Sequence, residues 1–326
     1  MRLLFLCFFY SLATNAQITY LPNNTARDHQ FFFLGENHGF RTNHEHALAM
    51  LRELKIKRPD LRYLLEESDL ATSIVLNEAI QTQDTVALRA LIARFGTTPM
   101  RTEETYRFYR GIMDLNRQYS DAPLQLLGVD IAVGGSQFAE EILATTTDEW
   151  LRAYLEQNRV RAQTAFDAPG SDWDRVRDEL MYQNFREVIA HYDLADQPMF
   201  GVWGNFHTLQ RPSKFANWLA ARMTADELSV YTVYQVYRKS QQLLPWHFRY
   251  RKHRGEDYIT VMNSSIGRGV LRRLGLDATS NHIVFDLAEI PARKVLSGVA
   301  SKATLNEWID ALLVVQNAPA NTPLNQ

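Results

Sequence analysis

The chain offers little sulfur chemistry and little excess charge. Its single cysteine, Cys7, lies in the apolar amino-terminal stretch. A chain cleaved after that stretch would contain no disulfide, no thiol nucleophile and no zinc–thiolate site. The formal net charge is −2 over 326 residues, which gives no global case for nucleic-acid binding. The one strongly basic run, 249–254, is interpreted as a solvated surface loop.

Two common catalytic signatures are also missing from the sequence. No Gly-x-Ser-x-Gly elbow is present, which disfavours serine-hydrolase chemistry on the α/β-hydrolase plan. Neither a Walker loop nor a Gly-x-Gly-x-x-Gly turn follows a predicted strand, which disfavours phosphate-cradling nucleotide sites. Direct attack by an activated water is therefore the simplest hydrolytic mechanism for this chain.

Residues 1–16 have the layout of a secretory signal peptide. Arg2 supplies a positive start, residues 3–12 are almost wholly apolar, and small residues lead up to Ala16. The apolar stretch is too short to span a bilayer comfortably. We expect cleavage after Ala16 and export of the mature chain, 17–326, to the periplasm or the extracellular space, without stable membrane insertion. A retained amino-terminal anchor is the alternative.

Buried strands alternate with amphipathic helices along the rest of the chain. This order predicts one α/β domain with a mostly parallel central sheet flanked by helices. Strands are predicted at 31–34, 61–65, 124–129, 198–203, 229–237, 258–262, 283–287 and 311–315. Helices are predicted at 43–56, 70–81, 85–94, 103–119, 148–157 and 173–192, with Thr102 as a cap. We expect the helical insertion 136–192 to cap the site.

Four predicted strands end on acidic or imidazole side chains, namely Glu36 with His38, Glu66, Asp130 and His207. Parallel strands joined by right-handed crossovers place their carboxyl ends on one edge of the sheet. We therefore expect these groups to converge on a shared site. Two acids and two histidines suit acid–base catalysis. Glu36, His38, Glu66 and His207 are equally a possible cage for a divalent metal.

Other polar residues near these strand ends are given supporting roles or none. Asp130 is expected to orient a histidine by accepting its ring proton. Arg110, on an amphipathic helix, either pairs with a buried carboxylate or is exposed. His44 and His46 face different ways on a helix, and one of them, taken as His46, is expected to reach the site. Glu67 is expected to be a solvated neighbour or a salt-bridge partner rather than a catalytic group.

Short motifs recur in a defined order along the chain. They are Leu-Gly-Glu-Asn-His-Gly at 34–39, Leu-Leu-Glu at 64–66, Gly-Val-Asp at 128–130, Val-Trp-Gly-Asn-Phe-His at 202–207, and the segment 308–315. Together they resemble the erythromycin esterase family, within a wider superfamily that includes haem-uptake lipoproteins and Tiki-type metalloproteases. The resemblance extends from about residue 31 to 325 and so covers nearly the whole mature chain.

The resemblance implies roles for four residues. Glu36 and His38 match the acid and the general-base histidine of the first family motif, Glu66 the second acid, and His207 the second catalytic histidine. Family esterases usually place two residues between the first Glu and His, whereas Asn37 alone stands here, as in the haem-uptake branch. The implied function is a hydrolase that activates water to cleave an ester or lactone-like bond in a small molecule. A metal-dependent hydrolase or peptidase at the same residues, and a haem-binding envelope protein, are the alternatives.

Overall fold

The computed structural model describes residues 18–324 apart from 23, 96–99, 133–136, 170–171, 213–218, 244–257, 262–271, 273–274, 277–279, 293–294 and 297–302. The predicted signal peptide, Cys7 and the basic run 249–254 lie outside the described residues. Among the described helices, none has the length and apolar character that a bilayer crossing requires.

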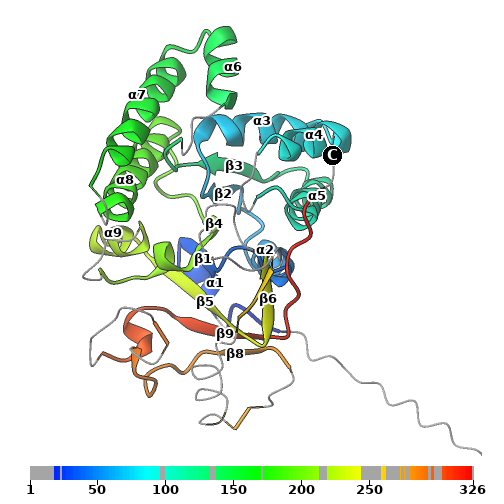
Figure 1. The fold of residues 1–326 in the computed structure, drawn as a ribbon, viewed down its shortest axis with the longest axis vertical. Coiled ribbons are helices and arrows are strands. Elements are labelled where there is room, and N and C mark those ends of the chain that lie inside the picture. The colour runs from blue at the N-terminus through cyan, green and yellow to red at the C-terminus, as the bar shows by residue number, and fades with distance from the viewer. Residues whose placement is uncertain are drawn as a thin grey trace, which may run out of the picture.

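Seven of the described strands form one sheet, in the order β3-β2-β4-β1-β5-β9-β8 (Figure 1). Pairing is parallel from β3 through β9, and only β8 runs antiparallel to its neighbour. The predicted mostly parallel α/β sheet is therefore confirmed. The strands are β1 (Phe31–Glu36), β2 (Tyr63–Glu66), β3 (Gln125–Gly128), β4 (Met199–Gly204), β5 (Val230–Arg238), β8 (His282–Val284) and β9 (Ala311–Gln316).

The predicted strand at 258–262 forms, but outside the central sheet. It is β7 (Tyr258–Val261), which pairs with β6 (Ser240–Leu243) in a separate antiparallel hairpin. This hairpin packs on the turn that follows β1, since the Leu243 amide donates to the Gly39 carbonyl at 3.0 Å. Gly39 has φ +97°, and a Cβ there would lie 2.1 Å from the Leu243 carbonyl oxygen. Only glycine fits this turn.

Helices cover both faces of the central sheet, as the alternating pattern predicts. They are α1 (Thr25–Asp28), α2 (Thr42–Lys57), α3 (Leu70–Gln81), α4 (Thr85–Ala93), α5 (Glu103–Gln118), α6 (Gln137–Thr145), α7 (Glu149–Phe166), α8 (Trp173–His191) and α9 (Leu219–Ala225). Short 3-10 turns are η2 (Asn205–Thr208) and η5 (Leu305–Glu307). The Thr102 cap forms, with its hydroxyl accepting from the Thr105 amide at 3.2 Å.

Helix α7 continues to Phe166, well beyond its predicted end at residue 157. Its buried face includes the polar Asn158 and Arg161, so a count of apolar periodicity stops too early. Arg161 donates to Asn184 of α8 at 2.6 Å and thereby holds the two helices together. The Asn158 and Asn184 amides both donate to the carbonyl of Asp130, at 3.2 and 3.1 Å. This buried network fixes the helical insertion against the end of β3.

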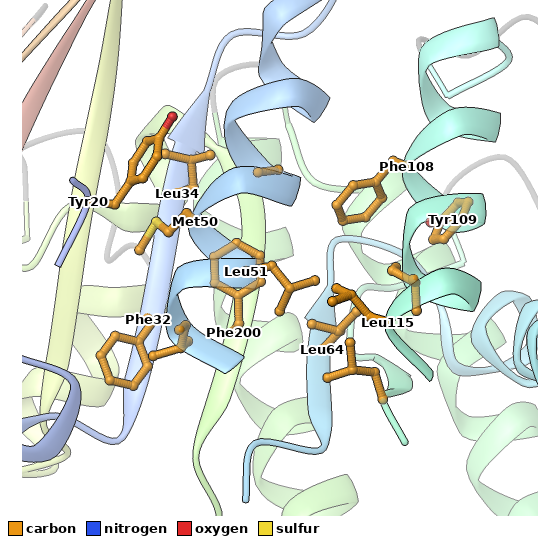
Figure 2. Close-up of a cluster of buried hydrophobic side chains, with 14 of the residues drawn as sticks. Tyr20, Phe32, Leu34, Met50, Leu51, Leu64, Phe108, Tyr109, Leu115 and Phe200 are labelled. Carbon is orange, nitrogen blue, oxygen red and sulfur yellow. The ribbon is translucent and has the colours of Figure 1, made fainter. Parts of the chain in front are cut away.

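The four apolar residues that open β1 divide between two cores. Phe32 and Leu34 pack with α2 and α5, and Figure 2 shows them with Met50 and Phe200 in the same cluster of side chains. Phe31 and Phe33 point to the opposite face and pack with α8 and α9. The cause is the two-residue period of a strand. The same alternation continues to the strand ends, where it sorts the polar residues.

Helix α2 provides a matched pair for testing the first core. Leu51 is 0% exposed within this core, whereas Ile56 on the same helix is 70% exposed. We expect Leu51→Ala to cost about 2–5 kcal/mol of unfolding free energy, through lost burial and a cavity. Ile56→Ala should change it by less than about 0.5 kcal/mol. Urea unfolding of both variants measures the difference, and equal costs would contradict the packing described.

Candidate active site

The carboxyl ends of β1 to β4 lie along one edge of the sheet. Glu36 of β1 is in register with Gly204 of β4, and Glu66 of β2 with Gly128 of β3. The polar residues at these ends, or a few residues beyond them, are consequently held near one another. This is the region in which parallel α/β sheets commonly carry their sites.

Glu36 and His38 form a close ion pair at the end of β1. The His38 Nδ1 lies 2.6 Å from Glu36 Oε1. Glu36 is buried, whereas the His38 side chain keeps 38% of its surface exposed. Burial works to lower the pKa of His38, but the hydrogen bond and charge of Glu36, with a contribution from Glu67, raise it to about 9. Its other nitrogen, Nε2, is left near the backbone of Gly204, where an added Cβ would lie 3.7 Å away.

His207 is held by two acids from different elements. It sits on η2, directly after β4, with Nδ1 2.7 Å from Oδ1 of Asp178 on α8 and Nε2 3.3 Å from Oε1 of Glu67. Burial opposes the charged form, but the charges and hydrogen bonds of Asp178 and Glu67 raise the pKa of His207 to about 10. An added Cβ at Gly204 would lie 3.4 Å from His207 Cδ2. Both imidazoles therefore lie against Gly204.

Arg177 of α8 neutralises the remaining carboxylates. Its guanidinium donates to Glu67 Oε1 at 2.9 Å and, through Nε, to Asp130 Oδ1 at 3.1 Å. Glu67 also accepts the Gly204 amide on Oε2 at 2.7 Å. Burial alone would raise the pKa of Glu67, but His207 and Arg177 hold it well below its ordinary value. Glu67 is thus a fixed negative charge between a histidine and an arginine.

Glu66 points to the face of the sheet opposite to that of Glu67, as strand alternation requires. Its Oε2 accepts the hydroxyl of Tyr109 of α5 at 3.1 Å. Burial raises the pKa of Glu66 to about 7, opposed by the Tyr109 bond and supported by the Glu67 charge. Of these two neighbouring glutamates, Glu67 is therefore the one in contact with His207, although the sequence analysis expected it to be a solvated neighbour or a salt-bridge partner rather than a catalytic group.

The predicted supporting residues lie in other surroundings. Asp130 contacts Arg177 rather than an imidazole, and Asp178 takes the orienting position beside His207. Arg110 is exposed and lies over the Tyr106 ring, 5.8 Å from its centroid.

The helical histidines also divide as their spacing indicates. His46 turns toward the amino-terminal segment, where its Nδ1 lies 2.6 Å from the Tyr20 hydroxyl oxygen, and burial lowers its pKa to about 4. His44 packs beside Phe108. Burial lowers the pKa of His44, and the charge of Glu36 partly opposes this shift. Of the two, His44 is the one on the side of the site.

Two residues that complete the cluster, Arg177 and Asp178, were absent from the sequence-based set. Asp178 is fully buried on α8, three and seven residues before the core residues Met181 and Phe185. A carboxylate on an apolar helical stripe is costly unless it has a partner. That position was the signal available in the sequence.

The predicted metal cage does not form from the described side chains. Glu36 and His38 are occupied with one another, and Glu66 binds Tyr109. Among the described residues, no group of three or more histidine, aspartate or glutamate side chains is arranged to hold a metal ion.

Comparisons with known proteins find relatives by structure and not by sequence. No protein-family model matches the chain, and no curated protein matches its sequence. A mutant of erythromycin esterase EreC in its open conformation aligns with a TM-score of 0.60 and 14% identity, over 92% of this chain and 94% of that one. The chain has the fold of erythromycin esterase. The predicted resemblance is thereby confirmed at the level of the fold.

Other solved structures share the erythromycin esterase fold. A Bacillus cereus protein aligns with a TM-score of 0.62 and 13% identity, covering 93% of this chain and 92% of that one. A succinoglycan biosynthesis protein aligns with a TM-score of 0.61 and 13% identity, covering 91% and 90%. The haem-binding ChaN of Campylobacter jejuni reaches a TM-score of only 0.35, with 11% identity over 64% of this chain and 82% of that one, and this match supports no inference.

The ion pairs of His207 with Asp178 and Glu67 predict a pH-dependent contribution to stability. Since folding raises the pKa of His207 from 6.5 to about 10, its stabilisation is complete below pH 6.5 and is lost as the pH rises through about 10. We expect the unfolding free energy of wild type minus that of His207→Gln to shrink steadily across this interval. Denaturant unfolding of both proteins at several pH values tests this. A difference that stays constant with pH would contradict the assigned ion pairs.

Proposed function

We propose that this protein is a hydrolase that cleaves an ester or lactone-like bond in a small molecule, with a water activated at His38. The observation that carries the proposal is the pair of imidazoles at Gly204, each with its Nδ1 against a buried carboxylate. A carboxylate that binds Nδ1 orients the ring and stabilises its protonated form. This leaves Nε2 of His38 as its nitrogen for proton transfer, whereas Nε2 of His207 also lies 3.3 Å from Oε1 of Glu67.

In this proposal His38 is the general base. Glu36 holds the ring so that Nε2, in its neutral form, removes a proton from the attacking water. Glu66 points to the same face of the sheet as Glu36 and is proposed to orient this water. The exposed part of the His38 side chain provides access for water and substrate.

His207 is the general acid and the electrostatic partner of the reaction. Its imidazolium, held between Asp178 and Glu67, is proposed to polarise the carbonyl oxygen or to protonate the leaving alkoxide from Nε2. Arg177 lies 3.3 Å from the same nitrogen and keeps Glu67 ionised. Opposite proton-transfer duties are thus divided between two histidines.

The fold supports the same reaction class. One structural neighbour with a TM-score of 0.60 is named an erythromycin esterase. A shared fold allows many chemistries, so the site geometry and not the neighbour carries the proposal. Aryl esters and macrolide lactones are the first substrates to test.

Removing either histidine should abolish the proposed hydrolysis. We expect His38→Ala and His207→Ala each to lower kcat/KM for an aryl ester by about 10²-fold or more, the usual contribution of a general base or acid. His191→Ala serves as the control, because His191 is exposed and stacks on Trp150 outside the site. Hydrolysis that survives both site changes would refute the assignment.

The pKa values of the two histidines predict an alkaline optimum. His38 acts as a base only when neutral, so kcat/KM should rise with pH toward the His38 pKa of about 9. His207 acts as an acid only when protonated, so kcat/KM should fall above the His207 pKa of about 10. The measurement is a pH–rate profile in buffers of constant ionic strength. An optimum below neutrality would contradict these roles.

The alternatives are separated by binding measurements on the same protein. Elemental analysis with a chelator control tests the metal-dependent reaction, which requires bound metal and chelator-sensitive activity. A haem titration tests the binding-protein alternative through a Soret shift that a histidine change abolishes. Export after removal of residues 1–16 stays a prediction, which amino-terminal sequencing of the secreted protein examines.

A further inference from the structure

A buried polar network on β5 reaches both segments that carry the histidines. The Tyr237 hydroxyl donates to Oδ1 of Asn43 at the start of α2. The Nδ2 of Asn43 then donates to the carbonyl of Asn37 at 2.8 Å. Asn37 is the single residue between Glu36 and His38. Tyr237 and Asn43 are 1% and 0% exposed, so water cannot replace these hydrogen bonds.

Gln235, which precedes Tyr237 on β5, holds the segment that carries the other histidine, His207. The Nδ2 of Asn205 donates to the backbone carbonyl of Gln235 at 2.9 Å, and Asn205 begins the turn that carries His207. Gly35 allows this turn to lie close to β1, since a Cβ there would be 2.7 Å from Asn205 Oδ1. One strand therefore contacts both site segments through side-chain amides.

We propose that Tyr237 is a positioning residue, which sets the Glu36–His38 pair for catalysis through Asn43 and the Asn37 carbonyl. The inference rests on the proposed function. A loop carbonyl held by a side-chain amide cannot rotate, and its two flanking side chains then keep their 2.6 Å contact. Asn43 can hold that carbonyl only while its own amide is fixed, and the Tyr237 hydroxyl fixes it. The aromatic ring has a separate task, since it stacks on Phe40 with the ring centroids 3.8 Å apart.

Tyr237→Phe isolates the hydroxyl, because the ring and its stacking on Phe40 are retained. Tyr231→Phe is a matched control on the same strand. Tyr231 is also buried, at 4% exposed, and its hydroxyl donates to the Tyr20 carbonyl at 2.9 Å, in a contact outside the network. Tyr231→Phe thus loses one buried hydrogen bond, whereas Tyr237→Phe loses the contact with Asn43 Oδ1 and a 3.1 Å contact with Gln235 Oε1. Only one of these bonds leads to His38.

We expect Tyr237→Phe to lower kcat for an aryl ester by about tenfold or more, with KM nearly unchanged, since small misplacements of a catalytic group are costly. NMR titration of the labelled imidazoles should show the His38 pKa falling from about 9 toward 6.5. The pKa of His207 should not move. Tyr231→Phe should leave kcat and both histidine pKa values at wild-type levels.

A second variant covers the case in which Tyr237→Phe folds poorly. Asn43→Ala interrupts the same chain of hydrogen bonds and should produce the same two changes. The double variant should then be no worse than either single one, because coupled residues are non-additive. Additive effects would overturn the inference, as would a wild-type kcat and His38 pKa in a folded Tyr237→Phe protein. If wild type hydrolyses no ester, the proposed function fails, and the NMR comparison of the two tyrosine variants still decides this inference.

Discussion

The half-buried guanidinium of Arg177 holds the acidic side chains at the sheet edge in place. Arg177 of α8 donates to the acid that follows β2 and to the acid that follows β3, and it lies 3.3 Å from the histidine that follows β4. Without it, Glu67 would lose one of the two positive groups that hold its pKa down against the effect of burial. With it, Glu67 stays ionised and keeps His207 protonated. The helical insertion therefore contributes Arg177 and Asp178 to the charged cluster at the sheet edge.

The strand period divides the site into two halves. Glu36 and Glu66 lie on the face that packs against α2 and α5, whereas Glu67 lies on the face of α8. The backbone of Gly204 lies between the histidines of the two halves. Neighbouring carboxylates with such different surroundings acquire different pKa values. Burial raises the pKa of Glu66 and so favours its neutral form, whereas ion pairs lower the pKa of Glu67 and favour its charged form.

The erythromycin esterase fold provides the frame for this arrangement, but it does not by itself specify a reaction. At 14% identity, the likeness to the neighbour extends to the course of the backbone only. The roles of the side chains depend on their own contacts in this protein. The contacts here concentrate on the two imidazoles, since each has its Nδ1 against a buried acid and His207 also contacts Glu67 through Nε2. The hydrogen-bond network on β5 contacts the backbone segments that carry the two histidines.

Local pattern in the sequence was enough for the strands of the central sheet, for most boundaries of the predicted helices, and for the position of Glu36, His38 and His207 at or just beyond strand ends. The reason is that two-residue and 3.6-residue periods are properties of short segments. Parallel crossovers then bring strand ends to one edge whatever the details of packing. The partners Arg177, Asp178 and Glu67 were decided only by tertiary structure. Their identity depends on how α8 crosses the sheet edge and on which face each side chain enters, and these depend on contacts between residues far apart in the chain.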